Sequence, residues 1–238
     1  MNWDAFFTLH RDLPREGPGT ADDVRWVLDT AGITGPVTVL DAACGPGADT
    51  ETLADALPDA QIHGIEKTPH FVTEAQARTA RFGPRVRITE GDMANPQGGP
   101  FDFICSAGAV YFLGITEALT AWRSHLRPGG AVAFSEPCLF QTPASDDALA
   151  FWEGYPTTDA TGIADRVTAA GYRTIATRKV SDQGWEDYFQ GVEIRAKALE
   201  PDADPDLADI IAQARKEAAD WRRLKDQTGY LLTIARPA

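Results

Sequence analysis

The stretch from residue 37 to residue 57 constrains the fold more than any other part of this sequence. Val37 to Leu40 is a short apolar and β-branched run, which predicts a buried strand that Asp41 ends. Gly45-Pro46-Gly47 follows, and residues 51–57 predict a helix. A glycine turn between a strand and a helix lets backbone N–H groups approach a ligand, because glycine has no Cβ. The alternative is an ordinary turn without a ligand.

A second acid favours the ligand-binding interpretation. Residues 61–65 predict the next strand, and Glu66 ends it. It lies about twenty residues beyond the glycine turn, the spacing of a carboxylate that accepts hydrogen bonds from ribose hydroxyls. The sequence therefore predicts a nucleoside site. A dinucleotide enzyme would have a third glycine where Thr50 stands, so a nicotinamide cofactor is the weaker of two choices.

Strand and helix patterns alternate through the rest of the chain. This alternation predicts an α/β fold with a doubly wound, mostly parallel sheet that binds ligands at the carboxyl ends of its strands. Thr20 and Asp23 form a capping-box-like start for a helix that Gly32 ends. The further predicted strands are residues 86–89, 101–106, 131–135, 172–180 and 230–235.

The run Asp41-Ala42-Ala43-Cys44-Gly45-Pro46-Gly47 resembles motif I of the class I S-adenosylmethionine-dependent methyltransferases. The resemblance implies a Rossmann-like seven-stranded sheet whose last strand is antiparallel, with helices on both faces and a helical lid. It also implies transfer of a methyl group from S-adenosylmethionine to a small-molecule acceptor, with S-adenosylhomocysteine as product. Later segments resemble the family in the same order: Gly64-Ile65-Glu66, Glu90-Gly91-Asp92-Met93, residues 101–106 and Leu126-Arg127-Pro128-Gly129-Gly130.

Two other functions stay open at this point. One is a non-catalytic or regulatory protein that binds S-adenosylmethionine, and the other is an NAD(P)-dependent oxidoreductase. The resemblance implies a single methyltransferase domain over residues 1–238. Within it, residues 1–19 are predicted to form an N-terminal arm, and residues 139–158 and 182–227 are predicted to form the lid and acceptor pocket.

The resemblance also implies roles for single residues in cofactor binding. Glu66 would take the ribose hydroxyls, and Asp41 would orient the methionine amine. Asp92 and Met93 would hold adenine, while Arg15 of the arm would lie against the methionine end. The predicted cofactor residues are Arg15, Asp41, Ala43, Gly45, Gly47, Glu66, Lys67, Asp92, Met93 and Ser106.

Five aromatic residues are candidates for the acceptor pocket, although aromatic side chains also commonly pack in cores. They are Tyr111, Phe112, Trp152, Trp185 and Tyr188. No residue is assigned a catalytic role. Glu136 follows a predicted strand and is either a general base or a solvated loop carboxylate, and we favour the loop carboxylate because most carboxylates are solvated.

Composition excludes several partners. The net charge of −13, without a Lys/Arg cluster, argues against nucleic acid. No apolar run approaches the roughly twenty residues of a membrane span, and the first residues lack a basic signal region.

The three cysteines and four histidines show no metal-ligand spacing, so no metal is expected. We expect a cytoplasmic monomer or homodimer.

Overall fold

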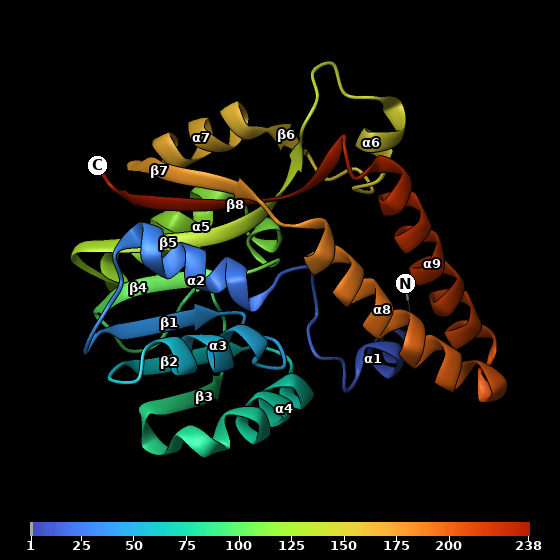
Figure 1. Ribbon diagram of the computed structural model, residues 1–238, viewed down its shortest axis with the longest axis horizontal. Coiled ribbons are helices and arrows are strands. Elements are labelled where there is room, and N and C mark those ends of the chain that lie inside the picture. Colours follow the sequence, from blue (N-terminus) through green and yellow to red (C-terminus); the bar gives the residue numbers. More distant parts are fainter. Residues whose placement is uncertain (1) are drawn as a thin grey trace.

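The computed structural model describes residues 2–238, so Met1 of the predicted arm lies outside the described residues. A single sheet runs through the molecule in the order β3-β2-β1-β4-β5-β8-β7 (Figure 1), and a two-residue strand β6 pairs with β5. The strands are β1 (Thr38–Ala42), β2 (Gln61–Glu66), β3 (Val86–Glu90), β4 (Phe101–Ser106), β5 (Leu126–Leu139), β6 (Thr158–Asp159), β7 (Tyr172–Lys179) and β8 (Thr228–Pro237).

The strand directions confirm the predicted doubly wound sheet. Strands β1 to β5 pair in parallel, whereas β8 is antiparallel to both β5 and β7. The sheet order reverses beside β1, so the loops after β1 and β4 open into a common crevice, where α/β sheets bind ligands. Strand β5 extends from Leu126 to Leu139, well beyond the predicted residues 131–135. It begins early because Leu126 pairs with Phe101 of β4, and it ends late because β8 pairs with it as far as Leu139.

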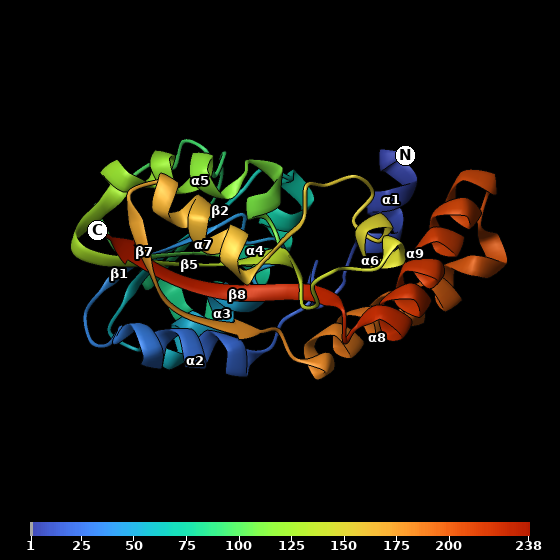
Figure 2. The same ribbon diagram turned by 90° about the horizontal axis from the view of Figure 1, so that it is seen from above.

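Helices cover both faces of the sheet. Figure 2 shows α2 and α3 on one side of the strands and α5 and α7 on the other. The predicted capping box of Thr20 and Asp23 begins α2, and Gly32 ends it in a left-handed conformation. The helices are α1 (Trp3–His10), α2 (Ala21–Ala31), α3 (Ala48–Ala56), α4 (Pro69–Thr79), α5 (Ile115–Trp122), α6 (Asp146–Ala150), α7 (Ala160–Ala169), α8 (Asp182–Leu199) and α9 (Pro205–Leu224).

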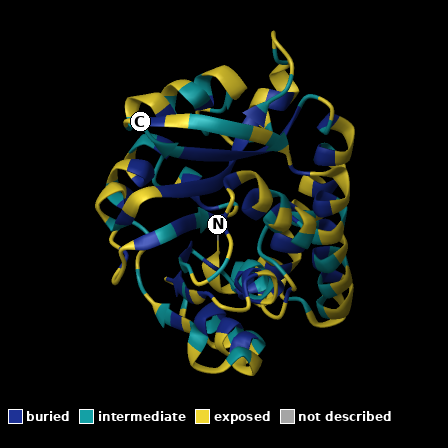
Figure 3. Ribbon diagram, turned by 60° about the vertical axis from the view of Figure 1, so that its left-hand side comes forward, coloured by how far each residue is buried: buried dark blue, intermediate teal, exposed yellow. Residues whose placement is uncertain are grey.

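Successive side chains of the central strands point to opposite faces of the sheet, so the core consists of two apolar clusters, one on each face. Val39 of β1 packs with α2 and α3 on one face, and the next residue, Leu40, packs with α5 and α7 on the other. Both are fully buried, as expected for a parallel strand covered on both sides. In Figure 3 the strands are mostly buried and the outward faces of the helices are exposed.

A third apolar cluster lies beside the sheet rather than on its faces. Helix α1 packs against α8 and α9 there, through Leu9 of α1, Val192 of α8 and Ile210 of α9 among others (Figure 1, right). The predicted lid segment 182–227 is thus mainly a helical pair, and the predicted arm begins as a helix that packs on it. Within residues 2–238, no helix combines the length and the apolar character that crossing a membrane would need.

Candidate functional site

The loop between β1 and α3 forms the floor of the candidate site. Gly45 and Gly47 have positive φ angles of 53° and 85°. A Cβ on Gly47 would lie only 2.9 Å from the Cβ of Ala75, so this glycine lets α3 and α4 pack closely. Around Gly45 only the side chain of Glu16 comes within 4 Å of such a Cβ, at 3.8 Å. Gly45 therefore has the open side that a ligand could approach.

Glu66 lies where the sequence predicts, at the end of β2 and beside this loop. Its side chain is buried, and Oε2 accepts a hydrogen bond of 3.0 Å from the backbone N–H of Gly45. Oε1 accepts a bond of 2.8 Å from the N–H of Thr68. A carboxylate has about four lone-pair positions, so two remain for ribose hydroxyls. The same group can hold the loop and bind a ligand.

Asp41 is buried at the end of β1. The hydroxyl of Thr50 donates to its Oδ2 over 2.5 Å. Burial and the nearby charge of Asp49 together raise the pKa of Asp41 to about 7, against the opposing effects of the Thr50 hydrogen bond and the charge of Arg15. Asp41 lines the pocket described below, and its role in orienting the methionine amine stays a prediction.

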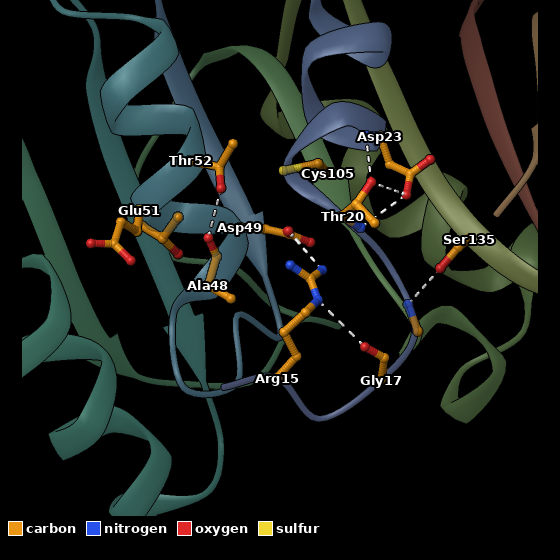
Figure 4. Close-up of polar contacts among 12 residues, drawn as sticks. Arg15, Gly17, Thr20, Asp23, Ala48, Asp49, Glu51, Thr52, Cys105 and Ser135 are labelled. Carbon is orange, nitrogen blue, oxygen red and sulfur yellow. Dashed lines mark hydrogen bonds and ion pairs between the residues drawn. The ribbon is translucent and has the colours of Figure 1, made fainter. Parts of the chain in front are cut away.

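Arg15 connects the N-terminal segment to the glycine loop. Its Nη2 atom lies 2.7 Å from Oδ1 of Asp49 in the first turn of α3, and its Nε donates to the carbonyl of Gly17. Figure 4 shows the guanidinium reaching across to Asp49. Sequence reasoning proposed Arg15 but missed Asp49, although an acid two residues after Gly47 could have suggested a partner.

A narrow pocket, mainly apolar, lies under this segment. It is lined by Arg15, Asp41, Asp49 and Ser106, together with apolar side chains of α2, α3 and the strands. Ser106 is buried, and its hydroxyl has no hydrogen-bond partner among the described residues. The structure thus brings three predicted cofactor residues, Arg15, Asp41 and Ser106, to one cavity.

The remaining predicted cofactor residues lie along the neighbouring strand ends. Asp92 follows β3 and is exposed, and one of its oxygens accepts from the N–H of Ala94 at 2.8 Å. The carbonyl of Met93 accepts from the indole N–H of Trp122 at 2.7 Å, which fixes this turn on α5. Lys67 follows β2 and is exposed. Ala43 lies in the glycine loop with a φ of 60°.

His10 and Glu16 extend the arm over the loop, which the sequence did not suggest. His10 Nδ1 lies 2.8 Å from Oε2 of Glu16. Burial raises the pKa of Glu16, and His10 opposes the shift. Because Glu16 packs near Gly45, the arm forms a wall opposite Glu66.

The five aromatic candidates for the acceptor pocket have different surroundings. Trp152 stacks on Tyr230 with ring centroids 5.5 Å apart. Trp185 is buried and stacks on Trp221 at 5.1 Å, so it packs α8 against α9. Phe112 is 70% exposed. Trp185 therefore packs in the core, which was the alternative to a place in the acceptor pocket.

Tyr111 and Tyr188 are half-buried where the helical pair faces the sheet. Burial raises the pKa of Tyr111 to about 12, and the charge of Glu217 on α9 adds to the shift. Burial also raises the pKa of Tyr188, again with a contribution from Glu217. Glu217 was not singled out from the sequence, and its charge places α9 close to these two phenols.

The expectation that Glu136 is a solvated loop carboxylate is wrong. Glu136 lies within β5 and its side chain has no solvent exposure, because β5 continues beyond the predicted end and pairs with β8. The hydroxyl of Tyr155 donates to Oε1 of Glu136. Tyr155 lies in the aromatic segment 139–158 but was not singled out from the sequence.

Among the described residues, no group of three or more His, Cys, Asp or Glu side chains is arranged to hold a metal ion. The three cysteines are free, and burial raises the pKa of the Cys44, Cys105 and Cys138 thiols. These thiols therefore behave as small packed side chains rather than as thiolates.

The comparisons with known proteins agree with this geometry. The sheet order, the glycine loop and the acid after β2 define the class I S-adenosylmethionine-dependent methyltransferase fold. Residues 39–130 match a family described as "Methyltransferase domain". The matched residues make up less than half of this chain, so the chain is similar to this family over that segment.

Individual relatives share part of the chain. It is 31% identical over 113 residues to a trans-aconitate 2-methyltransferase of Streptomyces avermitilis, a match that covers 46% of this chain and 42% of the relative. The same protein of Methylobacterium nodulans is 30% identical over 145 residues, covering 60% and 53%. The chain thus spans about half the length of the curated relatives that it matches.

A solved structure extends the likeness to the whole fold. The methyltransferase of Geobacter sulfurreducens, crystallised with S-adenosylhomocysteine, matches with a TM-score of 0.85. The match covers 99% of this chain and 98% of that one at 20% sequence identity. At this identity the likeness concerns the fold.

Proposed function

We propose that this protein transfers a methyl group from S-adenosylmethionine to a small-molecule acceptor. The observation that carries the proposal is the contact of the buried Glu66 carboxylate with the Gly45 N–H. This contact puts a hydrogen-bond acceptor for ribose beside a backbone that a ligand can approach. The partnerless hydroxyl of Ser106 also fits a polar ligand, because buried polar groups normally have a partner.

Each part of the site has a distinct task in this proposal. Glu66 binds the ribose hydroxyls, and Asp92 with the turn at Met93 binds adenine. Arg15, Asp41 and Ser106 surround the methionine end, with the backbone of Ala43, Gly45 and Gly47 beneath it. Lys67 borders the ribose from the exposed side.

When bound, S-adenosylmethionine supplies a methyl group that its sulfonium already activates. The chain therefore needs to orient the acceptor and exclude water. Tyr111, Phe112, Trp152 and Tyr188 are proposed to line the acceptor side, with Trp185 supporting them from the core. The partly apolar surroundings suit a small molecule. The names of the relatives make trans-aconitate one acceptor to test.

Calorimetric titration with S-adenosylmethionine, S-adenosylhomocysteine and NAD tests the cofactor. We expect binding of the first two and not of NAD. Glu66→Ala should weaken the affinity by about 1–3 kcal/mol, because it removes charge-assisted hydrogen bonds. Asp59→Ala is the matched control, since this exposed acid precedes β2 at its opposite end.

Unchanged affinity in Glu66→Ala would contradict the proposed site. Binding of NAD alone would favour the oxidoreductase alternative, and binding without turnover of any acceptor would favour a regulatory protein. A cytoplasmic location and a monomeric or dimeric state stay predictions, which fractionation and light scattering can test.

A further inference from the structure

Glu136 lies at the ligand-binding edge of the sheet. Ser106, the last residue of β4, pairs with Phe134 of β5, so Glu136 is two residues beyond the end of β4. The loop after β4 leads directly to Tyr111, and Gly108 in that loop donates its N–H to Ser135 Oγ over 2.7 Å. Glu136 is therefore level with the loop that separates the cofactor side from the acceptor side.

The carboxylate of Glu136 has few partners for a fully buried charge. Oε1 accepts from the phenol of Tyr155, and Nη1 of Arg166 is 4.0 Å from the same oxygen. The Nη2 atom of Arg166 instead donates to the carbonyl of Pro156 at 2.8 Å. Oε2 of Glu136 has no hydrogen-bond partner among the described residues. A buried carboxylate is normally paired or bonded several times.

These surroundings raise the proton affinity of the Glu136 carboxylate. Burial raises the pKa of Glu136 to about 7, while the hydrogen bond from Tyr155 and the charge of Arg166 oppose the shift. Such a carboxyl is poised for proton transfer at neutral pH. The titratable and charged groups that face it are Tyr155, Arg166 of α7, Cys138 of β5, Tyr111 after β4 and Tyr230 of β8.

Tyr155 connects this buried acid to the acceptor side. Its ring is half-buried and packs edge-on against Tyr111 with centroids 6.0 Å apart. A phenol that donates its proton to one group can still accept a hydrogen bond from another. Tyr155 can therefore stand between the buried carboxylate and a molecule beside Tyr111.

We propose that Tyr155 and Glu136 together accept a proton from the methyl acceptor, which is consequently a hydroxyl or an amine. The proposal rests on the proposed methyl transfer. The proton leaves the oxygen or nitrogen of the acceptor for the Tyr155 oxygen, and the Tyr155 hydroxyl proton passes to Oε1 of Glu136. The acceptor atom keeps the electron pair with which it bonds to the methyl carbon. The sulfur takes the pair of the broken S–C bond and becomes a neutral thioether.

This substrate class differs from the one that the names of the curated relatives suggest. A carboxylate such as those of trans-aconitate is already ionised at neutral pH and needs no base. Two arginines near this edge already contact protein groups, Arg15 with Asp49 and Arg166 with Pro156 and Glu136. Part of the hydrogen-bonding capacity of each guanidinium is thus taken up by the protein, which weakens it as a partner for an acidic substrate.

The test compares Glu136→Gln and Tyr155→Phe with the parent chain. Glu117→Gln is the matched control, because this glutamate is exposed on α5. Production of S-adenosylhomocysteine is followed from pH 5.5 to 9 with trans-aconitate, a catechol and a primary arylalkylamine as acceptors. We expect turnover of the catechol or the amine, with a kcat that falls below pH 7. Glu136→Gln should lower kcat by about 10²–10⁴-fold and remove this dependence.

A second measurement needs no acceptor. Carboxyl carbons of ¹³C-labelled glutamate are titrated by NMR with S-adenosylhomocysteine present, and the signal missing in Glu136→Gln identifies Glu136. Titration near pH 7 supports the proposal, whereas titration near the ordinary value of about 4.3 overturns it.

Three kinetic outcomes would also overturn it. They are turnover of trans-aconitate alone, an unchanged pH dependence in Glu136→Gln, or a raised KM with unchanged kcat. The last result would mean that Tyr155 and Glu136 only anchor segment 139–158. Failure of the proposed methyl transfer is distinguishable, because the parent chain would then bind neither S-adenosylmethionine nor S-adenosylhomocysteine, or would bind them and turn over no acceptor at all.

Discussion

Two regions at the same edge of the sheet each contain a buried carboxyl with a raised pKa, and they are built differently. On the proposed cofactor side, Asp41 lies among close sequence neighbours, bonded to Thr50 and near Asp49. On the proposed acceptor side, Glu136 contacts Tyr155 and Arg166, which come from separate elements. The first region depends on one short motif, whereas the second depends on how distant segments pack. Substitutions should therefore affect the two regions differently.

The largest effect is expected from Trp221→Ala on the acceptor side. Trp221 is 1% exposed and stacks on Trp185, so its removal leaves a cavity between α9, α8 and the sheet. The free energy of unfolding should fall by about 3–5 kcal/mol in urea denaturation. Ile194→Ala is the control, because Ile194 is exposed on α8 and should change stability little. Similar values for both variants would mean that α8 and α9 do not fold with the sheet.

On the cofactor side, Gly47→Ala should destabilise more than Gly129→Ala. Both glycines have left-handed φ angles, 85° and 81°, but only a Cβ on Gly47 would contact Ala75. We expect a loss of about 1–2 kcal/mol at Gly129 from the backbone alone and about 2–4 kcal/mol at Gly47. Thermal unfolding of both variants measures the difference. Equal losses would show that α4 moves away easily and that the motif tolerates a side chain there.

The smallest effect is a pH dependence that both regions share. The folded state holds protons on Asp41 and Glu136 up to about pH 7, whereas the unfolded chain releases them near pH 4. The unfolded chain binds fewer protons between these values, so the free energy of unfolding falls as pH rises from 4 to 7.

Glu136→Gln should remove one of these two contributions. The free energy of unfolding of the variant, taken relative to that of the parent, should rise by on the order of 1–3 kcal/mol from pH 4.5 to pH 8. Urea denaturation at each pH measures it. Glu117→Gln should follow the parent curve. A parallel curve for Glu136→Gln would mean that Asp41 and other groups account for the whole dependence.

The sequence predicted the positions of the glycine loop and its neighbouring acids far better than the surroundings of Glu136. Strand, glycine turn and acid occupy one continuous stretch, so periodicity and spacing located Asp41, Gly45 and Glu66 correctly. The contact between Glu136 and Tyr155 depends on how far β8 extends along β5, which local pattern does not encode. The buried state of Trp185 likewise depends on Trp221, and no spacing rule joins residues of two helices.

The place of β8 inside the sheet, next to the edge strand β7, has a consequence for the order in which the chain can assemble. This strand spans Thr228–Pro237 yet lies between β5 and β7, pairing Ala235 with Val132 about a hundred residues earlier. During synthesis the five parallel strands can form first, and β5 then keeps an open, apolar edge until residues 228–237 emerge. Such an edge can join a second nascent chain. Slow translation of residues 228–237 should therefore lower the yield of folded protein more than slow translation of the motif loop.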